Sequence, residues 1–328
     1  MSVSYFIINS EVERWRKNMK NSDYIIETNN LTKVYNTNIV VNEVNIKVKK
    51  GQIYGLLGRN GAGKTTIMRM LLNLALPTQG QIQLFGEDIS KNKPKNVYYR
   101  IGSLIEAPGF YSNLTGRQNL QILAKLRGNH KKSSVDQALE IVGLKEEHTK
   151  IFSNYSLGMK QRLGIAAAIM HEPELLILDE PTNGLDPVGI ALVREYLERL
   201  CKETGTTILI SSHILSEIEQ IADVIGILHE GKMVEEVSMD LLHKRNREYI
   251  EFVVSDAKKA SFLLEEKFHF TDYRIVGNHS IQLFQAFESR ARINHLFVQN
   301  DIEVSTVQLN EKKLEDYFKE LIGGDVIG

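Results

Sequence analysis

The stretch that most constrains this chain is Gly58-Arg59-Asn60-Gly61-Ala62-Gly63-Lys64-Thr65-Thr66. An apolar run at residues 52–57 precedes it, and residues 67–72 after it have a composition that favours a helix. Between a strand and a helix, this pattern indicates a phosphate-binding loop, because its glycines let successive backbone N–H groups point into one concavity at a helix N-terminus. Lys64 is expected to reach the outer phosphates of a nucleoside triphosphate, and the Thr65 hydroxyl to ligate Mg²⁺. The alternative is a glycine-rich turn that fits the pattern by chance.

The composition is that of an ordinary globular protein. The 328 residues are 42% hydrophobic and 25% charged, which is enough for a large core and for two domains. The formal net charge of −1 does not point to a nucleic-acid partner. The single cysteine, Cys201, excludes an intramolecular disulfide and a thiolate metal cluster, which fits a reducing cytosol. No window approaches the roughly 18 consecutive apolar residues of a membrane span, so any membrane-crossing part is expected in another chain.

The first residues are interpreted as an appendage to the folded part. Residues 5–8 form an apolar patch that is too short for the core of a signal peptide. Residues 1–22 allow three interpretations: a poorly ordered tail, a short amphipathic helix that includes Trp15, or an over-long gene start with the initiator at Met19. We favour the N-terminal tail.

Two strands are predicted before the phosphate-binding loop. Residues 24–27 and 39–48 both read as strands, and the second run alternates apolar and polar side chains. Tyr35 lies between them, and from the residues alone it is interpreted as a turn aromatic that caps a small sheet.

Polar side chains follow two buried strands farther along the chain. Residues 174–178 form a continuous apolar run, typical of a strand buried on both faces of a parallel sheet, and the run ends at Asp179 and Glu180. Carboxylates at the carboxyl end of such a strand lie where open α/β sheets bind ligands, although an acidic turn is the simpler alternative. Residues 206–210 predict another buried strand, which ends near His213. A lone histidine is usually structural, but this position at the same sheet edge favours a function.

Capping patterns predict a helical insert at about residues 107–160. Thr115 and Gln118 form a capping box that opens the first helix of the insert. Ser156 is a natural N-cap for a later helix, whose N-terminus favours an anion, although a capped helix alone accounts for the pattern. Asp186, followed by proline, is the N-cap of another helix that ends before Gly205.

The character of the chain changes after about residue 240. A linker is predicted at residues 238–246, and residues 247–328 predict a small α+β domain. Its order of strand, helix, two strands, helix and strand is that of a ferredoxin-like domain. A last helix is predicted to start at Asn310, with an apolar face that either packs on this domain or binds a partner. No catalytic constellation is recognisable in this part.

The ordered set of motifs at residues 23–237 resembles the ATP-binding cassette of ABC transporters. The resemblance implies an α/β P-loop NTPase fold, with a mixed sheet core and a helical insert. The loop described first matches the family's Walker A motif, and residues 175–179 match Walker B, with Glu180 as the catalytic carboxylate. Tyr35 stands where the family places an aromatic ring that stacks on adenine.

Three further positions complete the resemblance. Ser156 and Gly158 stand in the family's signature motif, Asp186 in its D-loop, and His213 at its switch histidine. The resemblance thus assigns nucleotide contacts to Tyr35, Gly58, Arg59, Asn60, Gly61, Ala62, Gly63, Lys64, Thr65, Thr66, Ser156, Gly158 and Asp186. It assigns metal contacts to Thr65, Asp179 and Glu106, and catalytic roles to Lys64, Glu180 and His213.

Two departures from the family pattern mark a subfamily. The signature has Leu157 where the family has glycine and Met159 where it has glutamine, and Glu106 replaces the glutamine of the Q-loop. An ionised carboxylate at Glu106 only accepts hydrogen bonds, but it is also a hard oxygen ligand for Mg²⁺. Residues 101–108, this signature and the extra C-terminal domain resemble the ATPase subunits of bacitracin-type and lantibiotic-type peptide-resistance exporters.

The resemblance implies partners as well as chemistry. Two cassettes are expected to pack head to tail as a homodimer, with ATP and Mg²⁺ held between the Walker A loop of one and the signature helix of the other. Separately encoded integral membrane permease subunits are expected as partners, and nucleic acid is not. The expected location is therefore cytoplasmic, peripheral on the inner face of the cell membrane.

The predicted function is ATP hydrolysis that drives export or removal of a membrane-active peptide antibiotic. The first alternative is the ATPase of an exporter for another substrate, such as a lipid, a polysaccharide or a small drug. A soluble, non-transport ABC ATPase that acts on ribosomes or DNA is a second alternative. The chain has one Walker A motif, no heptads and no basic patch, which argues against that class.

Overall fold

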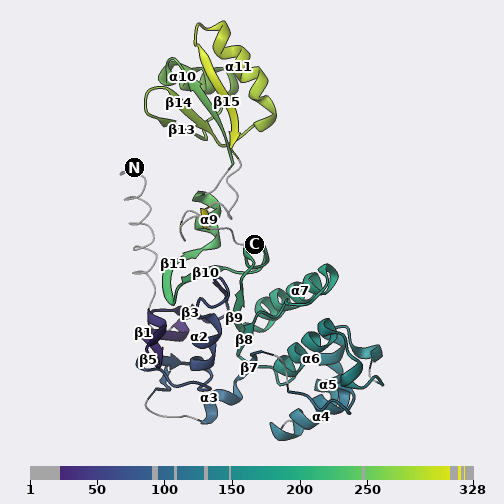
Figure 1. Ribbon diagram of the computed structural model, residues 1–328. Helices are drawn as coiled ribbons and strands as arrows, with labels where there is room; N and C mark the ends of the chain where they lie inside the picture. Colours follow the sequence, from purple (N-terminus) through teal and green to yellow (C-terminus); the bar gives the residue numbers. More distant parts are fainter. Residues whose placement is uncertain are drawn as a thin grey trace. The chain divides into compact units, whose positions relative to one another are not determined.

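The computed structural model describes residues 23–90, 95–106, 109–128, 132–147, 149–245, 248–310, 317–318 and 321. The tail predicted for residues 1–22 lies outside the described residues, as does most of the helix predicted from Asn310. The described chain divides into two compact units, the first ending at Met239 and the second beginning at Asp240. Each unit is traced in Figure 1.

The centre of the first unit is a sheet with the strand order β11-β10-β4-β9-β8-β7. Neighbouring strands from β10 to β7 are parallel, and β11 pairs antiparallel with β10, which gives the predicted mixed sheet. The strands are β4 (Ile53–Leu57), β7 (Ile101–Leu104), β8 (Leu175–Asp179), β9 (Thr207–Ser212), β10 (Val224–His229) and β11 (Lys232–Ser238). Every residue of β4, β8 and β9 is buried, as expected of interior strands of a parallel sheet.

Helices follow the inner strands of this sheet. They are α2 (Lys64–Leu71), α7 (Pro187–Thr204) and α8 (Leu215–Glu219). The helix α2 buries Ile67 and Met68 in one core with Leu56 of β4 and Ile177 of β8. Because the parallel strands all point the same way, the loops between strand and helix meet at one edge of the sheet.

A second, antiparallel sheet shares this core. Its strand order is β2-β1-β5-β6, and β3 also pairs with β1. The strands are β1 (Tyr24–Tyr35), β2 (Asn38–Val44), β3 (Lys47–Lys49), β5 (Gln79–Leu84) and β6 (Glu87–Asp88). The first predicted strand is therefore longer than residues 24–27, because β1 continues past a shift of register between Asn29 and Thr32. Tyr35 consequently ends a strand rather than standing in a turn.

The helical part of the first unit includes the predicted insert and extends past both of its limits, with α3 before residue 107 and the end of α6 after residue 160. It contains α3 (Lys95–Tyr99), α4 (Gly116–Leu126), α5 (Lys132–Ile141), α6 (Leu157–Ile169) and the short turns η2 (Lys145–Glu147) and η3 (Phe152–Asn154). Figure 1 shows α4, α5 and α6 grouped together. The predicted capping box is confirmed: Gln118 N donates to Thr115 Oγ1 at 3.2 Å, and Thr115 N donates to Gln118 Oε1 at 2.9 Å.

The second unit has the predicted order of strands and helices. Its elements are β12 (Tyr249–Val254), α10 (Ala257–Phe268), β13 (Tyr273–Val276), β14 (Ser280–Leu283), η4 (Phe287–Ser289), α11 (Arg290–Gln299) and β15 (Val304–Asn310). They form an antiparallel sheet in the order β13-β14-β12-β15. A separate core contains Phe252 and Phe297, whose ring centroids lie 5.4 Å apart in an edge-on pair. The helix α9 (Met239–Arg245) occupies the range that the sequence predicted as a linker.

Helix length and hydropathy bear on membrane insertion. In the part of the chain that the structure describes, no helix combines the length and the apolar character needed to cross a bilayer.

Candidate active site

The phosphate-binding loop joins β4 to α2 as predicted. Gly63 is the N-cap of α2 and has a φ of 107°, a conformation that a side chain makes costly. A Cβ atom on Gly63 would lie 2.8 Å from Val40 O, and one on Gly58 would lie 2.5 Å from Leu228 O. Glycine is therefore required at both positions by close backbone contacts, and the turn delivers Lys64 and Thr65 at the start of the helix.

Lys64 is a buried cation at the centre of the site. Its side chain is 5% exposed, and Nζ donates to Gly58 O at 2.6 Å and to Arg59 O at 3.3 Å. The same Nζ lies 3.1 Å from Glu180 Oε1. A buried ammonium group requires such partners, so the loop and the carboxyl end of β8 are joined through this one side chain.

Asp179, at the end of β8, is surrounded by hydroxyl groups. Thr65 Oγ1 donates to Asp179 Oδ2 at 2.7 Å, and Ser211 Oγ donates to Asp179 Oδ1 at 2.6 Å. Ser211 Oγ also accepts a hydrogen bond from Glu180 N at 2.9 Å. Asp179 and Ser211 are partners in the parallel pairing of β8 with β9, so the sheet register sets this contact.

Glu180 lies between two basic side chains. His213 Nδ1 is 2.5 Å from Glu180 Oε2, whereas Lys64 contacts the other carboxylate oxygen, Oε1. The backbone of Glu180 has a φ of 48°, in the left-handed region that residues other than glycine seldom adopt. Its carbonyl oxygen accepts from Gln161 Nε2 at 3.1 Å, which ties it to α6. The predicted catalytic residues Lys64, Glu180 and His213 thus form one continuous series of contacts.

Glu106 is paired elsewhere. Its exposed carboxylate forms an ion pair with Arg69 of α2, and its backbone has a φ of 60°. Among the described residues, no group of three or more histidine, cysteine, aspartate or glutamate side chains is arranged to hold a metal ion. A metal contact at Glu106 therefore stays a prediction.

The predicted nucleotide contacts outside the loop include two exposed helix caps and a partly buried glycine. Ser156 and Asp186 are the N-caps of α6 and α7, accepting from Met159 N at 3.2 Å and from Gly189 N at 3.0 Å. A Cβ atom on Gly158 would lie 3.2 Å from the carbonyl oxygen of Gly184, so the signature turn and the loop before α7 are adjacent.

Tyr35 is also accessible at the surface. Its side chain is 44% exposed at the end of β1, and Lys33 Nζ lies 4.7 Å from the centroid of its ring. An accessible aromatic ring suits stacking on a base, but the role of Tyr35 stays a prediction.

Sequence reasoning missed the polar side chains that hold the predicted ones. Ser211, Gln161 and Arg69 contact Asp179, Glu180 and Glu106, respectively. Ser211 stands two residues before His213 at the end of the same predicted strand, so its position was a usable signal. Nothing in the local pattern around Gln161 or Arg69 indicates their partners.

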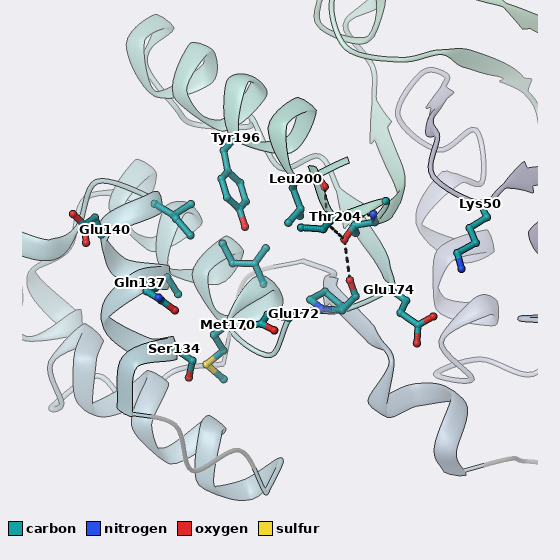
Figure 2. A pocket seen from close by; sticks show the side chains of 16 residues that line it. Lys50, Ser134, Gln137, Glu140, Met170, Glu172, Glu174, Tyr196, Leu200 and Thr204 are labelled. Carbon is teal, nitrogen blue, oxygen red and sulfur yellow. Dashed lines mark hydrogen bonds between the residues drawn. The ribbon is translucent and has the colours of Figure 1, made fainter. Parts of the chain in front are cut away.

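A cavity of about 690 Å³ lies apart from these residues, between α5, α6 and α7. Lys50, Pro173 and Thr206, which precede β4, β8 and β9, line it, so it is at the amino ends of the strands. Figure 2 shows Tyr196 of α7 pointing into this cavity, and burial raises the pKa of its hydroxyl to about 12. The cavity contains none of the predicted site residues, which lie at the opposite ends of the strands.

Comparisons with known proteins agree with the geometry. The ABC transporter family model matches residues 41–183. The bacitracin transport ATP-binding protein BcrA of Enterococcus faecalis is 60% identical over 302 residues, covering 92% of this chain and 97% of that protein. The lantibiotic transport ATP-binding protein SrtF of Streptococcus pyogenes is 44% identical over 216 residues, covering 66% of this chain and 92% of that protein.

A solved structure shares the fold. The structure of an ATP-binding subunit of an ABC transporter superposes with a TM-score of 0.61 at 29% identity, covering 67% of this chain and 92% of that chain. The predicted resemblance to ABC cassettes, and to bacitracin-type and lantibiotic-type relatives, is confirmed by these matches. The chain therefore belongs to the ABC transporter family, as one of its ATP-binding ATPase subunits.

Proposed function

We propose that this chain hydrolyses ATP to drive the export or removal of a membrane-active peptide antibiotic of the bacitracin or lantibiotic type. The observation that carries the chemistry is the series of contacts from Lys64 through Glu180 to His213. The substrate class is supported by the identity with a bacitracin transport ATP-binding protein over nearly the whole chain. The peptide is expected to pass through separately encoded membrane permease subunits, with this chain at the cytoplasmic face of the membrane.

In this proposal the loop from Gly58 to Thr66 holds the phosphates. The backbone N–H groups of the loop and the N-terminus of α2 favour the negative charge, and Lys64 neutralises the outer phosphates. Glu180 orients and polarises the attacking water, and His213 holds that water and the γ-phosphate in line. Positioning and charge stabilisation supply most of the catalysis in phosphoryl transfer, so a rigid series of contacts suits the reaction.

The proposed metal is Mg²⁺, held by Thr65 and Asp179. Their oxygen atoms converge to 2.7 Å, and a hydroxyl and a carboxylate are hard oxygen donors of the kind that Mg²⁺ prefers. A site with so few protein ligands fits Mg²⁺, which usually keeps several waters and substrate phosphate oxygens as ligands. When bound, the ion would supply positive charge that neutralises the phosphates.

The proposed active unit is a head-to-tail pair of cassettes. Ser156, Gly158 and Asp186 would contact the nucleotide held by the second copy, since all three lie at helix starts, where Ser156 and Asp186 are exposed and Gly158 is partly buried. Leu157, between Ser156 and Gly158, is 67% exposed and is therefore accessible to a second copy. Tyr35 would stack on the adenine ring.

We also propose that the second unit is a ferredoxin-like accessory domain, with domain limits at residues 23–237 and 247–328. The supporting observations are its order of strands and helices, its antiparallel strand order β13-β14-β12-β15 and its own core. The sheet order places the two strands that follow helices, β13 and β15, at its two edges, with β12 and β14 between them.

Antibiotic sensitivity in a deletion strain tests the proposed function. The wild-type chain should restore resistance to bacitracin or to a lantibiotic, and Glu180→Gln should not, because the amide cannot polarise water as a carboxylate does. Glu172→Gln is a matched control: Glu172 also has a left-handed backbone, with a φ of 56°, but it lies outside the site. Resistance that is independent of the chain, or restored equally by Glu180→Gln, would contradict the proposal.

A further inference from the structure

Two loops at the sheet edge carry the catalytic pair. Glu180 begins the loop between β8 and α7, and His213 lies in the loop between β9 and α8. Their side chains meet at 2.5 Å, so the geometry of the pair depends on how these two loops are held relative to each other. A contact that joins the loops would therefore control the pair without touching the substrate.

Glu217 of α8 makes that contact. Its carboxylate oxygen Oε2 accepts a hydrogen bond from Thr182 Oγ1 at 2.7 Å and another from Ser212 Oγ at 3.1 Å. Thr182 is two residues after Glu180, and Ser212 immediately precedes His213. One carboxylate oxygen thus joins both loops, each within two residues of a catalytic side chain.

The hydrogen bonds around Ser212 fix the direction of this contact. Ser212 Oγ accepts from Ile214 N at 2.9 Å, which closes a turn around His213. Ser212 is buried, so its single hydroxyl hydrogen is directed to Glu217 rather than to solvent. Ionised carboxylates accept stronger hydrogen bonds than neutral groups do, which makes Glu217 an effective anchor for both loops.

Space beside the contact gives the loops somewhere to move when it is lost. A cavity of about 370 Å³ lies between α7 and α8, and Thr182, Ser212 and Glu217 are among the residues that line it. A close-packed neighbourhood would hold the loops in place without Glu217, whereas a cavity permits displacement. Misplacement of catalytic groups by about 1 Å is enough to cost roughly a hundredfold in rate.

We propose that Glu217 is a positioning residue, which sets the separation and orientation of Glu180 and His213 by joining the loops that carry them. The inference rests on the proposed ATP hydrolysis, because it assigns Glu217 a part in that reaction. Glu217 does not reach the phosphate-binding loop by any hydrogen bond found among the described residues, so nucleotide binding is expected to be independent of it.

Steady-state ATPase kinetics of the full chain test this inference. Glu217→Ala should lower kcat by at least about tenfold and leave the KM for ATP within about twofold. The reason is that Glu217 is proposed to orient Glu180 and His213, whereas other residues bind the nucleotide. Glu217→Gln should restore most of kcat, since its amide oxygen accepts the same two hydrogen bonds. Glu219→Ala, on the same helix, is the matched control and should retain kcat.

A double-mutant cycle separates positioning from general stability. If Glu217 acts through the catalytic pair, Glu217→Ala should add little to the loss caused by His213→Ala alone. Thr182→Val and Ser212→Ala each remove one of the two hydrogen bonds to Glu217 and should lower kcat less than Glu217→Ala does. If Glu217→Ala folds poorly, these two variants still test the inference. Thermal unfolding of each variant identifies any that are unfolded.

Three results would overturn the inference. They are an unchanged kcat in a folded Glu217→Ala variant, a Glu217→Gln variant as slow as Glu217→Ala, or fully additive losses with His213→Ala. A wild-type chain without ATPase activity would instead overturn the proposed function, and this inference with it, so the two failures are distinguishable.

Discussion

Asp179 and Glu180 are adjacent carboxylates with different surroundings. Asp179 accepts hydrogen bonds from the hydroxyls of Thr65 and Ser211, whereas Glu180 lies between the basic groups of Lys64 and His213. The left-handed backbone at Glu180 turns the chain away from the strand direction immediately after Asp179. The two acids are therefore suited to different tasks, and this difference underlies the roles proposed for them.

Loss of the Lys64 side chain tests the phosphate-binding loop at the residue scale. Lys64→Ala should weaken nucleotide binding by at least about tenfold, because hydrogen bonds to charged groups contribute roughly 1.5–3 kcal/mol. Titration with a fluorescent ATP analogue measures the change. Lys202→Ala removes an exposed lysine of α7 and should leave the affinity unchanged. Equal affinity in Lys64→Ala and wild type would refute the loop's proposed role.

A partly buried histidine outside the site predicts acid sensitivity. Burial, with the nearby charge of Arg127, lowers the pKa of His171 from its ordinary 6.5 to about 4. The unfolded chain takes up this proton below about pH 6.5 and the folded chain only near pH 4, so stability is lost as pH falls through that window. His171→Gln should flatten the fall of Tm between pH 6.5 and 4 and change its slope little above pH 7. An identical acid slope in both proteins would contradict this.

At the scale of elements, helix starts position much of the predicted site. Ser156, Asp186 and Thr115 are side-chain N-caps of α6, α7 and α4, so a local pattern in the sequence sets where each helix begins. The cap of α4 is reciprocal, because the Gln118 side chain accepts from the backbone of Thr115. These caps anchor the helical part from which the signature turn projects.

Removal of one cap measures its contribution. Thr115→Ala should lower the free energy of unfolding by about 1 kcal/mol, the usual contribution of such an N-cap. Thr115→Ser is the matched control, since serine presents the same hydroxyl, and it should stay close to wild type. Urea unfolding followed by circular dichroism compares the three proteins. Equal losses for alanine and serine would exclude a capping origin.

Local patterns predicted the elements better than their pairing. The buried strands β8 and β9 and the capping box of α4 followed from the sequence, because each depends on residues close in the chain. The full length of β1 did not, because Asn29-Asn30 reads as a break, yet Asn30 takes a φ of 47° and the strand continues beyond the irregularity.

The same reasoning explains what was missed in the site. Lys64, Asp179, Glu180 and His213 stand in motifs at fixed places, so their meeting at one sheet edge could be predicted. The contact of Ser211 with Asp179 depends on strand register, which a single sequence does not state. Gln161 reaches Glu180 from α6, and only the tertiary arrangement shows that approach.

At the scale of the molecule, the chain has separate cores in its two units. One core joins the two sheets of the first unit around α2, and the other lies between the sheet and helices of the second. The phosphate-binding loop and its partners belong wholly to the first unit. Nucleotide binding should therefore stabilise the first unit directly and leave the stability of the second unit unchanged.

Scanning calorimetry tests this independence. The full chain should unfold in two transitions, because units with separate cores break two-state behaviour. MgATP at about 100 times its Kd should add roughly 2.7 kcal/mol to the first unit and move only its transition upward. Lys64→Ala should abolish that shift. A single transition, or an equal upward shift of both, would show that the units unfold together.

The left-handed backbone at Glu180 has an evolutionary consequence. Glycine would relieve the conformational cost at this position, whereas a glutamate there pays a penalty of order 1–3 kcal/mol, by the general scale for such residues. Random mutation screened only for thermostability should therefore enrich glycine or asparagine at this codon, and the enriched proteins would be inactive. Selection for ATP turnover should keep glutamate at this position. Stability and activity therefore favour different residues at position 180, which is not expected for the neighbouring buried residues of β8.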